Sequence, residues 1–118
     1  MLGRLNEAAR EGEEILALAS DRFRPLLVLA EVRQWQYRWH EAARLQEEAL
    51  CSARTLSREA MVREQIGRRL FDEGRYRAAA AELEWARDLH RTNGASDARI
   101  LICEQALTRA RELDTLKP

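Results

Sequence analysis

A short segment of the chain returns 37 residues later. Residues 38–43 read Arg-Trp-His-Glu-Ala-Ala, and residues 75–80 read Arg-Tyr-Arg-Ala-Ala-Ala. The same offset relates Ala49 to Ala86. A repeat of this length is typical of a supersecondary unit that cannot bury its apolar face alone and is stabilised by stacking on its neighbours. The spacing therefore predicts a helical repeat protein.

The apolar periodicity agrees with helices throughout. Apolar and small residues recur at helical spacing, and no segment alternates with the period of two that marks a strand. Gly74 is expected to end one helix as a left-handed C-cap, and Thr92-Asn93-Gly94 to end the next. Pro25 fits the first turn of a helix, where the N–H groups have no intrahelical partner. We expect an all-α fold, a right-handed solenoid of antiparallel helix pairs with about six helices.

Breakers and caps divide the chain of 118 residues into these helices. Ser20 or Asp21 is the expected cap of the second helix, Thr55 or Ser57 of the fourth, and Ser96 or Asp97 of the sixth. We expect one domain over residues 1–118, in which two repeat units, about 23–59 and 60–96, lie between flanking helices 2–18 and 96–114. Residues 116–118 should be loose.

Charge and hydropathy exclude several classes of partner. Twenty basic and twenty acidic residues cancel and are interspersed, so no basic stripe points to nucleic acid. No apolar run is longer than that of residues 26–30, which is far shorter than the roughly 20 residues that span a bilayer. The N-terminal segment leads into an amphipathic pattern without a signal-peptide core. A cytoplasmic protein without membrane contact is expected.

The second unit carries a specific pattern: an aliphatic residue followed by a small one, a Gly-x-Tyr turn, and then alternating small and large apolar positions. These positions are Ile66, Gly67, Gly74, Tyr76, Ala79, Leu83 and Ala86. The first unit repeats the pattern at Leu29, Ala30, Trp39, Ala42 and Ala49. Both units resemble the tetratricopeptide repeat. Small residues at Gly67, Ala79 and Ala86 would let helix axes come close, with larger side chains filling the space between them.

Two departures from that family stand out. The turn glycine is replaced by Tyr37 in the first unit. The spacing of 37 exceeds the usual 34, which predicts helices or a connection longer by about one turn. Stretched repeats of this kind resemble the sensor regions of large bacterial transcription activators.

The resemblance implies where a partner would bind. In stacked helix pairs of this type, the first helix of each pair lines the concave side. The positions are Arg24, Leu27, Glu31, Gln34 and Trp35 in the first unit, Arg68, Phe71 and Asp72 with Met61 and Glu64 in the second, and Gln105 and Arg109 with Leu101 and Thr108 in the closing helix.

Trp35 and Phe71 are the expected anchors, because aromatic residues beside arginine often dominate the energetics of interfaces. The alternative is that both rings pack into the adjoining helix pair, since large aromatics are mostly buried. Trp85 is expected to be exposed on the convex side, where it would suit a dimer contact. Two functions follow: a scaffold that binds a peptide or partner protein in its concave groove, or a self-association module, the latter within a bacterial regulatory or signalling assembly.

Catalytic and metal chemistry find little support in the sequence. His40 and His90 lie far apart without Cys, Asp or Glu at a recognisable metal spacing. Cys51 and Cys103 are isolated, which suits reduced thiols in a packed interior. No Gly-rich phosphate loop or nucleophile motif occurs, so neither an enzyme nor a cofactor or metal site is expected.

Overall fold

The computed structural model describes residues 2–116, which form six helices and no strand. The helices are α1 (Leu2–Leu18), α2 (Phe23–Trp35), α3 (Trp39–Ser52), α4 (Leu56–Asp72), α5 (Tyr76–Thr92) and α6 (Asp97–Leu116). The prediction of an all-α chain with about six helices is confirmed. None of the helices within residues 2–116 has the length and apolar content needed to cross a bilayer. Residues 117–118, part of the terminus expected to be loose, lie outside the described residues.

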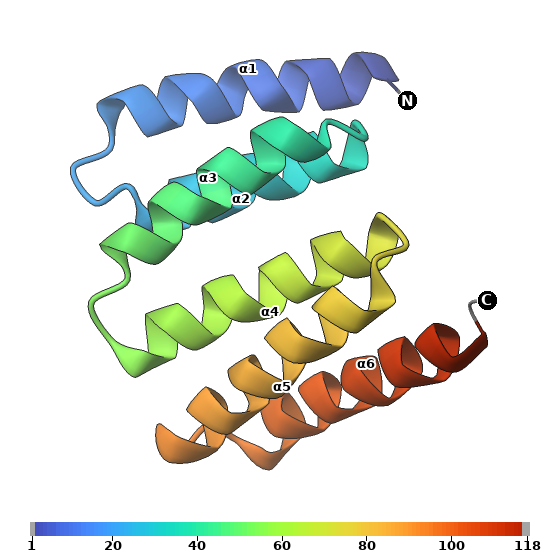
Figure 1. Ribbon diagram of the computed structural model, residues 1–118. Coiled ribbons are helices and arrows are strands. Elements are labelled where there is room, and N and C mark those ends of the chain that lie inside the picture. The colour runs from blue at the N-terminus through green and yellow to red at the C-terminus, as the bar shows by residue number, and fades with distance from the viewer. Residues whose placement is uncertain (1, 117–118) are drawn as a thin grey trace. The chain divides into compact units, whose positions relative to one another are not determined.

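The chain divides into two compact units, Met1–Ser52 and Ala53–Pro118. The first holds α1, α2 and α3, and the second holds α4, α5 and α6. Within each unit, consecutive helices run antiparallel and pack on one another (Figure 1). The middle helix of each unit therefore contacts both of its neighbours.

In the first unit, α2 packs against both α1 and α3. Phe23, Leu26 and Leu29 are among the largest fully buried side chains. A Cβ atom on Gly12 would lie 3.0 Å from the Leu29 Cδ1 atom, so α1 and α2 approach closely at this glycine. The contact explains why a small residue stands at this position in the apolar stripe of α1.

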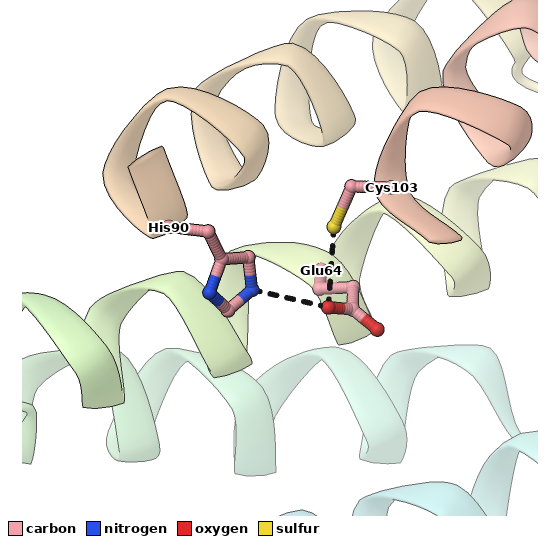
Figure 2. Close-up of side chains that lie close together, drawn as sticks. All are labelled: Glu64, His90 and Cys103. Carbon is pink, nitrogen blue, oxygen red and sulfur yellow. Dashed lines mark hydrogen bonds and ion pairs between the residues drawn. The ribbon is translucent and has the colours of Figure 1, made fainter. Parts of the chain in front are cut away.

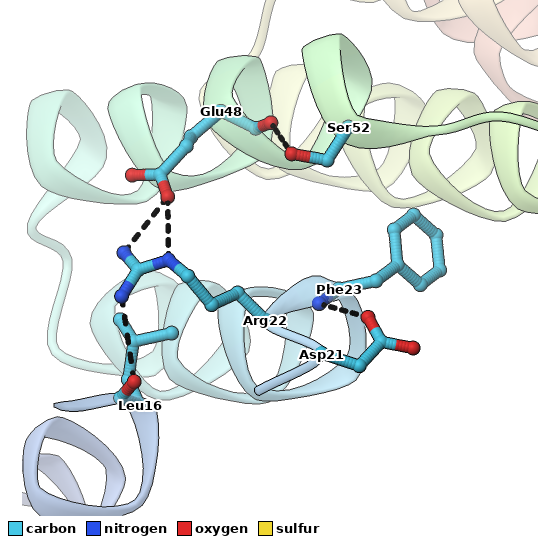
Figure 3. Close-up of polar contacts among 6 residues, drawn as sticks. All are labelled: Leu16, Asp21, Arg22, Phe23, Glu48 and Ser52. Atoms are coloured by element: carbon cyan, nitrogen blue, oxygen red, sulfur yellow. Dashed lines mark hydrogen bonds and ion pairs between the residues drawn. The ribbon is translucent and has the colours of Figure 1, made fainter. Parts of the chain in front are cut away.

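The start of α2 is fixed by Arg22 (Figure 3). Its guanidinium donates two hydrogen bonds to Glu48 Oε2 on α3, at 3.1 and 2.8 Å, and one to the carbonyl oxygen of Leu16 on α1, at 3.4 Å. The N-cap is Arg22 instead of the expected Ser20 or Asp21, and its side chain caps no N–H group. The Asp21 carboxylate accepts a hydrogen bond from the Phe23 N–H at 3.1 Å. Asp21 therefore caps the helix from the residue before the N-cap position.

In the second unit, α5 lies between α4 and α6. A Cβ atom on Gly67 would lie 2.7 Å from Leu83 Cγ and 3.4 Å from the carbonyl oxygen of Ala79. Ala79 and Ala86 are both fully buried. The predicted close approach of helices is confirmed at Gly67 and Ala79, and Ala86 is buried.

Three helices end in the same hydrogen-bonded turn. At the end of α4, the Gly74 N–H donates to the carbonyl of Phe71 and the Arg75 N–H to that of Leu70, both at 2.9 Å. This pair of bonds is a Schellman motif, and Gly74 takes the left-handed conformation with φ of 80°. The ends of α2 and α5 repeat both bonds, with Tyr37 (φ 61°) and Gly94 (φ 73°) in the left-handed position.

Two predicted caps are confirmed. The Thr55 hydroxyl accepts a hydrogen bond from the Arg58 N–H, and the Ser96 hydroxyl accepts one from the Arg99 N–H.

The prediction that both cysteines are buried is wrong for one of them: Cys51 is exposed, while Cys103 is buried as expected. Cys51 lies two residues after buried Ala49, which turns its side chain about 200° away from that position on the helix.

Candidate functional site

One face of α2 is exposed and carries three of the predicted partner residues. Arg24, Glu31 and Trp35 are exposed, and so is Val28 between them. Spacings of four, three and four residues keep these side chains within about 60° of one another around the helix. Trp35 is 56% exposed and Val28 58% exposed. We name these four residues the α2 face.

Leu27 and Gln34, which were predicted on the same surface, are buried. Both lie roughly 60–80° around the helix from Arg24, and the two share one side because they are seven residues apart. Trp35 is 56% exposed, as an anchor residue requires, and this exposure does not support the alternative that its ring packs into the adjoining helix pair. The side of α2 available to a partner is therefore narrower than expected.

The predicted partner residues of the second unit have varied surroundings. Arg68 is exposed but ion-paired with Glu64 at 2.8 Å, and Glu64 itself is buried. Phe71 is half-buried against Tyr76, edge to face with a centroid distance of 5.2 Å. Of the other predicted positions, Met61 is half-buried, and the exposed ones are Asp72, Leu101, Gln105, Thr108 and Arg109.

Trp85 is exposed, as predicted, at 48%. One face of its indole is nevertheless covered, because the Arg63 guanidinium carbon lies 3.5 Å from the ring centroid. Arg63 also donates hydrogen bonds from Nη1 to the Glu82 carboxylate, at 3.3 and 3.2 Å. This cation–π contact holds α4 against α5 and leaves one indole face open.

The second unit also contains a buried polar cluster, formed by Glu64 of α4, His90 of α5 and Cys103 of α6 (Figure 2). Glu64 Oε1 lies 3.2 Å from His90 Nε2 and accepts a hydrogen bond from the Cys103 thiol at 3.3 Å. The three donor atoms lie within 4.8 Å of one another. Exposure is 6% for Glu64, 3% for His90 and zero for Cys103.

Two arginines balance the charge of this carboxylate. Arg68 Nη2 lies 2.8 Å from Glu64 Oε2, and Arg99 Nη1 lies 3.6 Å from Oε1. Both arginine side chains are about half exposed, so their charges remain solvated while the carboxylate is buried. A buried carboxylate needs such partners because its desolvation is costly.

Burial raises the pKa of the Cys103 thiol from 9.0 to about 12, and the neighbouring Glu64 charge adds to the increase. A thiol with this pKa is almost entirely protonated at neutral pH and is a poor nucleophile. Cys103 is also inaccessible to a substrate. The cluster is therefore unsuited to thiol catalysis, although its imidazole, carboxylate and thiol are all metal-ligand types.

Sequence reasoning missed this cluster because its members lie 26 and 39 residues apart. Each of them nevertheless has a detectable signal in the sequence, because it is a polar side chain at helical spacing from buried apolar positions. Glu64 comes four residues after Ala60, His90 four after Ala86, and Cys103 four before Leu107. Those apolar positions are all buried.

Comparison with known proteins gives no match to this chain among family models, curated proteins or solved structures.

Proposed function

We propose that the chain is a non-catalytic protein-binding module whose contact surface in the first unit is the α2 face. The observation that carries this proposal is the exposure of Trp35 and Val28 on one side of a helix. Neither Arg24 nor Glu31, which flank them, is in an ion pair within residues 2–116, so both charges are available to a partner. An exposed tryptophan is typical of an interface hot spot, and Arg24 adds a cation on the same face about three turns away.

The architecture behind this proposal is a right-handed, tetratricopeptide-like stack. It is supported by two features that recur at the spacing of 37 residues. The Schellman turn at Tyr37 recurs at Gly74 with the same donors and acceptors. Ala42 and Ala49 are fully buried, and so are their counterparts Ala79 and Ala86. A stack of this type would present α2 and α4 on its concave side to a peptide or partner protein, as in a bacterial regulatory or signalling assembly.

Site-specific photo-crosslinking tests the proposal. A benzophenone amino acid is placed at Trp35 in one variant and at Trp85 in another, and each is irradiated in extract of the source organism. We expect the Trp35 variant to crosslink to a distinct protein. Excess unlabelled chain should abolish this capture by competition when it carries Tyr37→Ala, which changes another exposed aromatic two residues away, but not when it carries Trp35→Ala.

Trp35→Ala should fold normally, because substitutions of exposed residues usually change stability by no more than about 0.5 kcal/mol. Circular dichroism of the variant checks this point. Capture of the same protein by the Trp35→Ala chain would contradict the proposal.

Self-association is the alternative, and the open indole face of Trp85 favours it. In that case the Trp85 crosslinker would join two copies of the chain, and sedimentation would show a dimer that Trp85→Ala converts to a monomer. The α2 face would then give no crosslink, and changing it would have no effect on sedimentation. The two functions therefore predict opposite crosslinking results for the Trp35 and Trp85 variants.

A further inference from the structure

The three donor atoms of the buried cluster match the ligand chemistry of zinc. Zn²⁺ is bound by thiolate, imidazole and carboxylate groups at about 2.0–2.3 Å, in tetrahedral geometry. Ligand atoms around such an ion are separated by roughly 3.3–3.8 Å, as follows from those bond lengths. The observed separations from Glu64 Oε1 are 3.2 Å to His90 Nε2 and 3.3 Å to Cys103 Sγ. The remaining pair lies within 4.8 Å, so small side-chain rotations would complete three corners of a tetrahedron.

We propose that Glu64 Oε1, His90 Nε2 and Cys103 Sγ form a zinc site that joins α4, α5 and α6. Because each ligand comes from a different helix, the ion would link all three helices of the second unit. The inference is independent of the α2 face, whose residues belong to the first unit.

The protonation change on binding can be followed atom by atom. Zn²⁺ replaces the proton on Cys103 Sγ, which passes to solvent. His90 Nε2 carries the proton of its hydrogen bond to Glu64 Oε1 in the metal-free cluster, so the ring must also change tautomer: the Nε2 proton leaves to solvent, one is taken up on Nδ1, and the Nε2 lone pair binds the ion. The Glu64 carboxylate contributes Oε1. With two anionic ligands and one neutral ligand, the ion and its ligands together carry no net charge.

The surroundings of the carboxylate suit one-oxygen ligation. Arg68 already holds Oε2 at 2.8 Å, so only Oε1 faces the imidazole and the thiol. Hydrogen bonds to the second oxygen of a ligating carboxylate commonly orient it at metal sites. Arg99 stands 3.6 Å from Oε1 and is the group that must withdraw. Its side chain is 48% exposed at the start of α6, so it can turn toward solvent.

The chain provides its own controls, because it has two cysteines and two histidines and only one of each lies in the cluster. Metal-free protein is titrated with Co²⁺, whose tetrahedral thiolate complexes give visible bands and a sulfur-to-cobalt charge-transfer band. We expect one Co²⁺ per chain, displaced by Zn²⁺. The spectrum should survive Cys51→Ser and His40→Ala, whereas Cys103→Ser and His90→Ala should weaken binding by more than about 100-fold, beyond the loss typical of an outer-shell partner.

A second measurement does not depend on changing the cluster. X-ray absorption of the Zn²⁺-loaded Cys51→Ser protein should show one sulfur at about 2.3 Å and nitrogen or oxygen neighbours at about 2.0–2.2 Å. Cys103 is then the one thiol left. A zinc shell without sulfur, a wild-type protein without the charge-transfer band, or loss of that band in Cys51→Ser would overturn the proposal. The cluster would then be a polar network closed by its own hydrogen bonds.

Discussion

Tyr37 takes the same left-handed position at the end of α2 that Gly74 takes at the end of α4, 37 residues later. A residue with a Cβ atom pays roughly 1–2 kcal/mol for this conformation, whereas glycine does not. The edge-to-face contact between Tyr37 and Trp39, with ring centroids 5.7 Å apart, offsets part of this free-energy cost. Aromatic contacts of this kind contribute about 0.5–1.5 kcal/mol.

The first prediction concerns Gly74. A Cβ atom at this position would meet nothing within 4 Å, so Gly74→Ala tests the backbone conformation alone. We expect the free energy of unfolding in urea to fall by about 1–2 kcal/mol. Gly3→Ala is the matched control, because it adds the same methyl group to open space inside α1 and should stabilise the protein slightly. Equal effects of the two changes would refute the backbone explanation.

The second prediction concerns the close approach of α4 and α5. Gly67→Ala would place a methyl group 2.7 Å from Leu83 Cγ, so it should destabilise the protein by about 1–3 kcal/mol. Leu83→Ala creates a cavity and should cost about 2–5 kcal/mol. In the double variant the new methyl has room, so the two losses should sum to more than the measured loss. Additive losses in urea unfolding would show that the two side chains do not clash.

The sequence was sufficient to predict structural features that depend on residues close to one another in the chain. Thr55 and Ser96 were predicted as caps because each precedes an apolar helical pattern, and both hydroxyls accept the expected N–H. Gly74 was predicted as a C-cap from its place after such a pattern. The small residue at Gly67 was predicted at a helix contact because the repeat places one there, and the Leu83 side chain lies against it.

Features that depend on the rotation of several helices could not be predicted. The burial of Leu27 and Gln34 follows from the phase of α2 against its neighbours, which periodicity alone does not define in a helix with apolar residues on most sides. The Glu64 cluster requires three helices to be placed correctly in rotation and in height at the same time. Residue spacing along one helix can mark a polar side chain as buried, but it does not show which side chains of the other helices lie beside it.

The third prediction uses the difference between the two cysteines. Thiolate is the species that reacts with disulfide reagents, and Cys103 is both inaccessible and raised in pKa to about 12. In native protein kept free of metal with a chelator, we expect one thiol, that of exposed Cys51, to react rapidly. Cys51→Ser should stay unreactive until denaturant unfolds the chain. Rapid labelling of the native Cys51→Ser protein would contradict the burial of Cys103.

The last prediction concerns Arg99, the cation that would compete with zinc for Glu64 Oε1. Removing its charge should favour metal binding, because the repulsion between guanidinium and ion disappears and the oxygen no longer needs to exchange partners. We expect Arg99→Gln to tighten Zn²⁺ binding by roughly tenfold, the lower end of the effects seen for groups around metal ligands. Competition against a fluorescent zinc chelator measures the change.

Arg91→Gln is the matched control for this experiment. Arg91 belongs to the same unit and is 51% exposed, close to the exposure of Arg99, but it pairs with Glu104 at 3.4 Å and not with Glu64. The control therefore reports the effect of net charge on zinc affinity. If both variants shift the affinity equally, the contribution of Arg99 is long-range charge alone. Weaker binding by Arg99→Gln would mean that this arginine orients the carboxylate, as Arg68 does from the other oxygen.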